Sequence, residues 1–255
     1  MEIYATQVVL FLLLFVRCTS LLVAAPFFGH EAVPVQIKVG LGMFIAFVLY
    51  PLMSAGGPQV DLRLGPLVLL AVKEAGVGLT IGFAASLIFS GVIAAGELVG
   101  FDLGFSMATV FDPETGVNNP IVGQFFYVIF MLVFFLVNGH HHVLQTLVLT
   151  YDVVPVGSLE ITGSLVDRIV SLCGIVFAVA AKLAAPVIVA SFLINVAFSV
   201  LARVAPQINV FVVSFPVKIG VGLLVLMTAG PMMVFVFKKL LSGFERNVLE
   251  LIKVM

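Results

Sequence analysis

Charged residues are scarce in this sequence of 255 residues. Asp, Glu, Lys and Arg make up 10% of the chain, whereas a soluble domain carries roughly 25%. This scarcity excludes an ordinary soluble domain and favours a membrane protein. The 12 basic and 13 acidic side chains give a net charge of −1, which argues against the basic surface that nucleic-acid binding requires. Cysteine is almost absent, and we expect Cys18 and Cys173 to be buried apolar side chains.

Motifs for catalysis or cofactor binding are also missing. The sequence has no nucleotide-binding loop, no GxSxG and no Cys/His cluster. The run His140-His141-His142 does not suit a metal, because successive positions of a helix point about 100° apart. Asp102 and Asp152 do not follow the motif order of the intramembrane aspartyl proteases, which need two facing carboxylates. We therefore expect no enzymatic activity, no catalytic residue, no metal and no cofactor.

Long apolar runs are what the sequence has instead. A helix needs about 20 predominantly apolar residues to span a bilayer. No soluble fold needs such runs repeatedly, so the sequence predicts an all-α membrane protein. Five runs contain no Asp, Glu, Lys or Arg: 39–60, 75–96, 115–151, 183–202 and 219–237. With the breakers between them, the chain divides into six apolar segments, at 3–28, 39–57, 75–96, 121–150, 169–202 and 208–237.

The C-terminal tail, residues 238–255, differs from these segments. Lys238, Lys239, Arg246 and Lys253 alternate with apolar residues at helical spacing, which predicts an amphipathic surface helix. With six spans, the positive-inside rule favours a cytoplasmic location for this tail and for both termini.

Small residues recur at every fourth position in two stretches, and such positions share one face of a helix. They make narrow grooves into which a second backbone can fit, and close packing drives helix association in lipid. Two interpretations stay open, namely packing within the chain and a right-handed assembly with other subunits. The residues that we assign to subunit packing are Gly78, Gly82, Ser86, Gly96, Gly100 and Gly104.

Several charged residues lie beside or inside the apolar segments. A Lys or Arg at the centre of a bilayer costs at least about 2.5–3.5 kcal/mol, so such residues normally face a water path or a partner. For Arg17 and Lys38, snorkelling of the side chain to the end of a helix is an equal alternative. The residues that we expect to pair across subunits are Lys73, Glu74, Glu97, Lys182, Arg203 and Lys218.

The connection at 106–117 is rich in turn residues and carries the bulky apolar side chains of Met107 and Phe111 beside acidic residues. A plain solvated loop does not need such side chains. The alternatives are an ordinary loop whose Phe packs on its own helix and a segment with a task of its own.

Two blocks in the C-terminal third carry the most specific motifs, ARxAPQxN at 202–209 and FPVK at 215–218. With them, the chain resembles the FliR family of flagellar export-gate proteins and their relatives in virulence type III secretion, and we favour the flagellar branch. Ser199 and Ser214 stand where the family pattern leads us to expect Gly. Further matching positions are Pro34, Lys38, Pro51, Glu74, Gly76, Gly78, Gly82, Phe83, Gly96, Glu97, Asp102, Gly104, Asp112, Pro113, 138–141, 155–157, Ala185, Pro186 and Asn195.

The resemblance implies helical hairpins packed in a right-handed helical hetero-oligomeric export gate of the bacterial inner membrane and flagellar basal body. Much of that gate would lie on the periplasmic side. Residues 1–167 would be the FliP-like part, 168–237 a FliQ-like hairpin and 238–255 the cytoplasmic tail. The implied partners are FliP-like and FliQ-like subunits, FlhB-like and FlhA-like export proteins, membrane lipid and unfolded secreted proteins.

The resemblance also implies that the connection at 106–117 projects into the pore and helps to plug it. Bulky apolar side chains could form a dewetted constriction, and Gly116 could let the loop move aside. The residues assigned to this plug are Met107, Val110, Phe111, Asp112, Pro113 and Gly116.

Two other functions fit the sequence. A stand-alone transporter of small solutes or ions would suit broken helices and embedded charges. A passive assembly scaffold without a gating role is the third interpretation.

Overall fold

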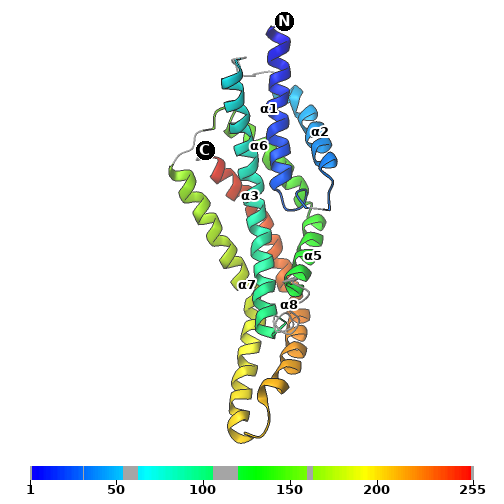
Figure 1. Ribbon diagram of the computed structural model, residues 1–255, viewed down its shortest axis with the longest axis vertical. Helices are drawn as coiled ribbons and strands as arrows, with labels where there is room; N and C mark the ends of the chain where they lie inside the picture. Colours follow the sequence, from blue (N-terminus) through cyan, green and yellow to red (C-terminus); the bar gives the residue numbers. More distant parts are fainter. Residues whose placement is uncertain (1, 31, 54–62, 106–119, 160–162, 254–255) are drawn as a thin grey trace. The chain divides into compact units, whose positions relative to one another are not determined.

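The computed structural model describes residues 2–30, 32–53, 63–105, 120–159 and 163–253, and every regular element in these ranges is an α-helix (Figure 1). This confirms the predicted all-α fold. The helices are α1 (Glu2–Ala24), α2 (Val35–Met53), α3 (Leu64–Leu103), α5 (Ile121–Leu136), α6 (Gly139–Val153), α7 (Gly163–Val204) and α8 (Val210–Ile252).

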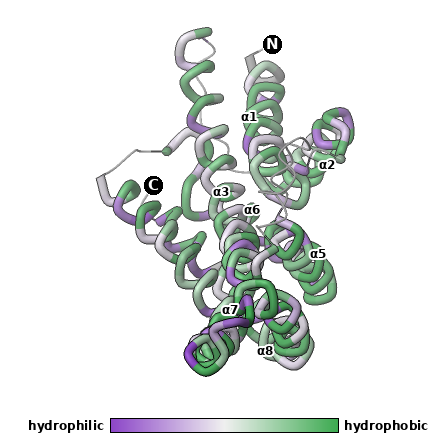
Figure 2. Tube along the Cα trace, turned by 60° about the horizontal axis from the view of Figure 1, so that its bottom comes forward, coloured by the Kyte–Doolittle hydropathy of each residue, from purple (hydrophilic) through white to green (hydrophobic). Residues whose placement is uncertain are grey.

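The helices are long and apolar enough for a membrane. Five candidate spans, at Ala5–Ala24 and in α2, α3, α7 and α8, meet the length and composition of a crossing helix, and α5 with α6 makes a sixth if the pair is one span. Figure 2 shows hydrophobic residues along all of these helices. The structure thus agrees with a membrane protein.

The predicted segment at 121–150 is divided into two helices. Asn138 adopts a left-handed conformation, with φ 56° and ψ 34°, which ends α5 and starts α6. Asn tolerates this conformation better than most residues do, because its short polar side chain can bond locally. His140, His141 and His142 consequently form the first turn of α6.

The described residues cluster into two compact units. Unit 1 comprises Met1–Leu87, Asn138–Cys173 and Leu241–Met255, and unit 2 comprises Ile88–Val137 and Gly174–Leu240. The division at 167/168 and 237/238 expected from the resemblance is defined by similarity to FliP-like and FliQ-like subunits. The two units are defined by contacts within the chain, so the expected division stays a prediction. No helix ends at residue 237, because α8 continues to Ile252.

Unit 1 holds most of the predicted tail, from Leu241 on, as the last part of α8. Its apolar residues Leu241, Phe244, Val248 and Leu251 are buried, and Glu250 forms an ion pair with Arg168 of α7. The described part of the tail is helical and buries apolar side chains against protein, and its place at a membrane surface stays a prediction.

Unit 2 has an aromatic core. The ring of Phe130 in α5 lies 4.5 Å from that of Phe89 in α3 and 4.8 Å from that of Phe237 in α8, all in edge-on arrangements. Phe130 and Phe237 are fully buried. Edge-on aromatic pairs stabilise a core beyond the area that they bury, so this contact is a main link between the three helices.

Candidate functional site

A buried ion pair joins α1 to α3 within unit 1. The Nε of Arg17 donates to Oε2 of Glu74 over 2.6 Å, and its Nη2 donates to Oε1 over 3.0 Å. The side chains are 0% and 1% exposed. Two parallel hydrogen bonds between a guanidinium and a carboxylate form the strongest and most directional arrangement of such a pair.

The same pair holds the backbone that follows α6. Both terminal nitrogens of Arg17 donate to the carbonyl of Val154, over 3.1 and 3.2 Å. The backbone N–H of Gly157 donates to Oε1 of Glu74 over 2.7 Å. The guanidinium carbon also lies 4.1 Å from the centre of the Tyr151 ring, at a distance typical of cation–π contacts.

We call Arg17, Glu74, Tyr151, Val154 and Gly157 the buried clamp. It joins α1, α3, the end of α6 and the connection after α6, which are far apart in the sequence. Buried backbone polar groups need hydrogen-bond partners, and the clamp supplies them for the Val154 carbonyl and the Gly157 N–H. Its two formal charges cancel and both charged side chains are at most 1% exposed, so the clamp holds these segments together.

The clamp changes two expectations. Glu74 was expected to pair across subunits, whereas its partner lies in the same chain. Arg17 does not snorkel to the end of α1, because its guanidinium is fully buried and saturated with acceptors. Neither residue therefore needs a second subunit to satisfy its charge.

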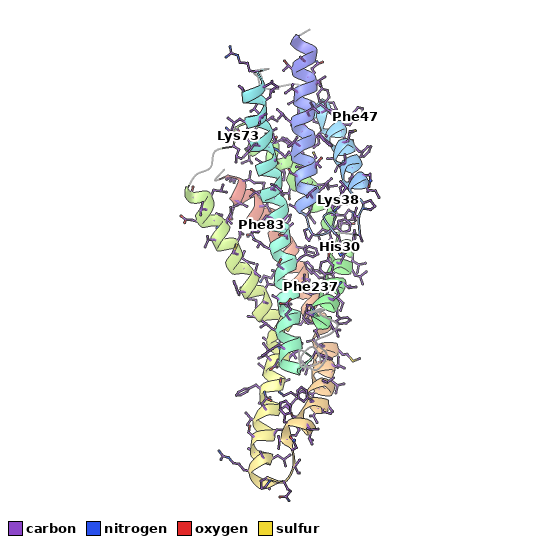
Figure 3. All side chains as sticks on the ribbon, viewed as in Figure 1. His30, Lys38, Phe47, Lys73, Phe83 and Phe237 are labelled. Carbon is purple, nitrogen blue, oxygen red and sulfur yellow. The ribbon has the colours of Figure 1, made fainter. Side chains whose placement is uncertain are left out.

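Two lysines of unit 1 bind backbone carbonyls. Lys73 of α3 donates to the carbonyl of Gly157 over 3.3 Å, and Lys38 near the start of α2 donates to that of Gly29 over 2.9 Å (Figure 3). Both contacts satisfy carbonyls of connections between helices. The predicted pairing of Lys73 across subunits stays a prediction.

The other embedded charges lie in unit 2. Glu97, Lys182 and Arg203 are exposed, and Lys218 is half-buried. None of the four forms an ion pair with any residue in the described ranges. The predicted pairing of these four residues across subunits stays a prediction.

Close helix packing in unit 1 uses Gly78 and Gly82 of α3. A Cβ at Gly78 would collide with Ser20 and with the Arg17 carbonyl of α1. A Cβ at Gly82 would lie 2.9 Å from the Leu21 carbonyl oxygen. Both contacts lie within the chain, so at these two positions the groove serves packing within the chain. Ser86 is half-buried and bonds the Phe83 carbonyl of its own helix.

Close packing in unit 2 uses the second small-residue stretch. A Cβ at Gly96 would lie 2.6 Å from the backbone nitrogen of Gly123 in α5, so these two backbones touch. Gly100 faces Val122 at ordinary contact distance. Gly104, with φ +87°, ends α3 beside the ring of Phe215. Packing of these positions against another subunit stays a prediction.

The predicted plug lies outside the described residues. Met107, Val110, Phe111, Asp112, Pro113 and Gly116 all belong to it, so its assignment stays a prediction.

Comparison with known proteins identifies the chain's kinship. A family model described as "Bacterial export proteins, family 1" matches residues 8–244, nearly the whole chain. Flagellar biosynthetic protein FliR of Bacillus subtilis is 33% identical over 252 residues, which cover 96% of this chain and 96% of that protein. The chain belongs to the FliR family.

Other members of the FliR family are similar over most of their length. FliR of Pectobacterium carotovorum is 32% identical, covering 83% of this chain and 80% of that protein. FliR of Escherichia coli is 30% identical, covering 81% of this chain and 78% of that protein. The names of these relatives describe flagellar biosynthesis, and the description of the family model names bacterial export.

Sequence reasoning missed the buried clamp of this FliR-family chain. A signal was present, because Arg17 and Glu74 are opposite charges inside two apolar helices. Their separation of 57 positions gives no periodicity that would join them. Arg17 was compared with the end of its own helix, whereas Glu74 was assigned to a partner in another subunit, so the two were not paired with each other.

Proposed function

We propose that this chain is a subunit of the flagellar type III secretion export gate in the bacterial inner membrane. With FliP-like and FliQ-like subunits it would form the gated pore through which unfolded flagellar proteins cross. The observation that carries the proposal is the similarity to FliR of Bacillus subtilis across 96% of both chains. FlhB-like and FlhA-like proteins would meet the gate in the basal body, with membrane lipid around it.

The uncovered charges of unit 2 support a role in assembly. Lys182, Arg203 and Glu97 are exposed on apolar helices, where lone charges are costly in lipid. An assembled gate would supply partners for them, whereas a chain acting alone would leave them in hydrocarbon. Within the gate, residues 1–167 would take FliP-like positions and 168–237 a FliQ-like position.

Secretion in cells tests the proposal. A strain without this chain should export no flagellar filament protein, and a plasmid carrying the chain should restore export. Restored export without any detectable contact between this chain and FliP-like or FliQ-like subunits would contradict a role as a gate subunit.

We assign the plug to the connection at 106–117, and the assignment rests on the family resemblance and on the bulky side chains at Met107 and Phe111. Deleting 110–116 should raise the leak of small ions through an assembled gate, because a dewetted constriction would be lost. The measurement is ion flux into vesicles that hold the purified complex. An unchanged leak from a fully assembled complex would favour a passive scaffold instead.

A stand-alone transporter of small solutes or ions is the second candidate. The break at Asn138 between α5 and α6 favours it, because discontinuous helices often build the substrate sites of transporters. Purified chain alone in liposomes should then move solute, whereas the gate proposal expects no transport from the chain alone.

A further inference from the structure

The end of the α7–α8 hairpin, residues 188–217, is hardly buried by the rest of this chain. In this stretch Ser191 is the single buried residue, and the whole stretch belongs to the described range 163–253. Its apolar side chains are largely exposed, including Phe192 at 63% and Phe211 at 58%. Contiguous apolar surface of this kind is covered by lipid or by another protein.

A polar layer crosses this apolar hairpin. Asn195 of α7 lies about 13 Å along the helix from the end at Val204, at 1.5 Å per residue. Lys218 of α8 lies about 12 Å from the start of its helix at Val210. The two residues are therefore at nearly the same level on the two arms of the hairpin, and we call them the Asn195–Lys218 layer.

The chain itself does not satisfy this layer. Lys218 forms no ion pair with any described residue. The Ser199 hydroxyl donates to the backbone carbonyl of Asn195 over 2.7 Å. Asn195 itself is an exposed residue. Lipid tails offer no hydrogen bond, and four methylenes are too short to carry the lysine ammonium the full distance to the end of the hairpin.

The charge balance of the hairpin points to what is missing. Between Asp167 and Glu245 the sequence contains no acidic residue, although Lys182, Arg203 and Lys218 lie in that stretch. Neither this hairpin nor the hairpin of a second copy can therefore supply a carboxylate, and Glu97 of α3 forms no ion pair with Lys218. A carboxylate accepts from both a lysine ammonium and an asparagine amide, which fits both members of the layer.

We infer that the Asn195–Lys218 layer docks an apolar helix of a different subunit that carries an Asp or Glu at the same level. The inference rests on the proposed function and adds to it the contact surface and the chemistry of the partner helix. The hairpin provides the cationic side of this contact, and a transmembrane helix of the partner provides the carboxylate.

Complex yield tests the inference. The chain is co-expressed with the FliP-like and FliQ-like proteins of the same genome, and the complex is purified in mild detergent. Lys218→Met and Asn195→Leu should each lower the recovered complex at least tenfold. Val200→Leu is the matched control, because Val200 is 58% exposed on the same arm and should leave the yield unchanged.

Charge reversal separates a direct contact from a folding defect. Lys218→Glu should abolish the complex, and changing one Asp or Glu of a partner's apolar helix to Lys should restore it. A photo-reactive residue at position 195 should join that same partner helix. Complex yields within twofold of wild type for Lys218→Met and Asn195→Leu would overturn the inference. So would failure of every partner reversal to rescue Lys218→Glu, or photo-labelling of lipid alone.

The outcomes also separate this inference from the proposed function. If the unaltered chain forms the complex and the variants do not weaken it, the docking surface is wrong and the gate proposal stands. If the unaltered chain forms no complex with these subunits, both are wrong.

Discussion

Replacing Arg17 by Met removes one partner of the buried clamp and leaves Glu74 as a buried, uncompensated carboxylate. Breaking a buried pair in this way typically costs about 3–5 kcal/mol. Arg17 and Glu74 are 0% and 1% exposed, so water does not replace the lost partner. The carbonyl of Val154 also loses both of its donors. We expect the free energy of unfolding to fall by at least about 3 kcal/mol, roughly a hundredfold in the equilibrium constant.

The assay is titration with a denaturing detergent in mixed micelles, followed by far-ultraviolet circular dichroism, because the chain has no tryptophan. Lys38→Met is the control. Its side chain donates one hydrogen bond to a backbone carbonyl, so the loss should be about 1 kcal/mol or less.

The double variant Arg17→Met with Glu74→Gln sharpens the test. Gln keeps an acceptor for the N–H of Gly157, which donates to Glu74 over 2.7 Å, and it carries no charge. The double variant should therefore be more stable than Arg17→Met alone by about 1–2 kcal/mol, since an uncompensated charge is worse than a neutral polar group. If the free energy of unfolding of Arg17→Met lay within about 1 kcal/mol of the wild-type value, the reasoning would be refuted.

Further predictions concern unit 2. Gly96→Ala should lower stability by about 1–3 kcal/mol through overpacking, because its Cβ would lie 2.6 Å from the backbone nitrogen of Gly123. The same substitution at Gly174, which has no heavy atom within 4 Å of the new Cβ, should be neutral or stabilising, and detergent titration of both proteins measures the difference. Phe130→Ala should cost about 3–5 kcal/mol, because the ring is fully buried between two others. Phe177→Ala, at a residue that is 78% exposed, is its control, and equal losses at the two positions would contradict the aromatic core.

Hydropathy predicted where the helices lie, but charged residues led us to expect a third helix that is too short. The predicted third segment began at residue 75 because Lys73 and Glu74 precede it, whereas α3 runs from Leu64. A helix can continue through these residues because Arg17 neutralises Glu74 and Lys73 bonds the Gly157 carbonyl. These compensations come from distant parts of the chain, so local composition cannot reveal them.

At Asn138 the error was the opposite one, since the predicted segment was longer than the helix that the structure shows. Residues 121–150 contain no Asp, Glu, Lys or Arg, and a single segment was expected there. The left-handed conformation of Asn138 divides it, and hydropathy is blind to a backbone angle.

The small-residue stretches were recognisable from their spacing, but their partners were not. Gly78 and Gly96 mark close approach in either interpretation, and only the structure places α1 and α5 against them. For Lys218 and Asn195 the limit is different. Their expected partner belongs to another chain, so neither the sequence nor the fold of this chain can contain it.

The most direct test of the account is the mass of the native particle. The chain should be purified in mild detergent with and without co-expression of the FliP-like and FliQ-like proteins of its genome, and weighed by native mass spectrometry. The account predicts one large hetero-oligomer that contains this chain on co-expression. A solitary, monodisperse chain under both conditions, from cells that still export flagellar protein, would contradict it.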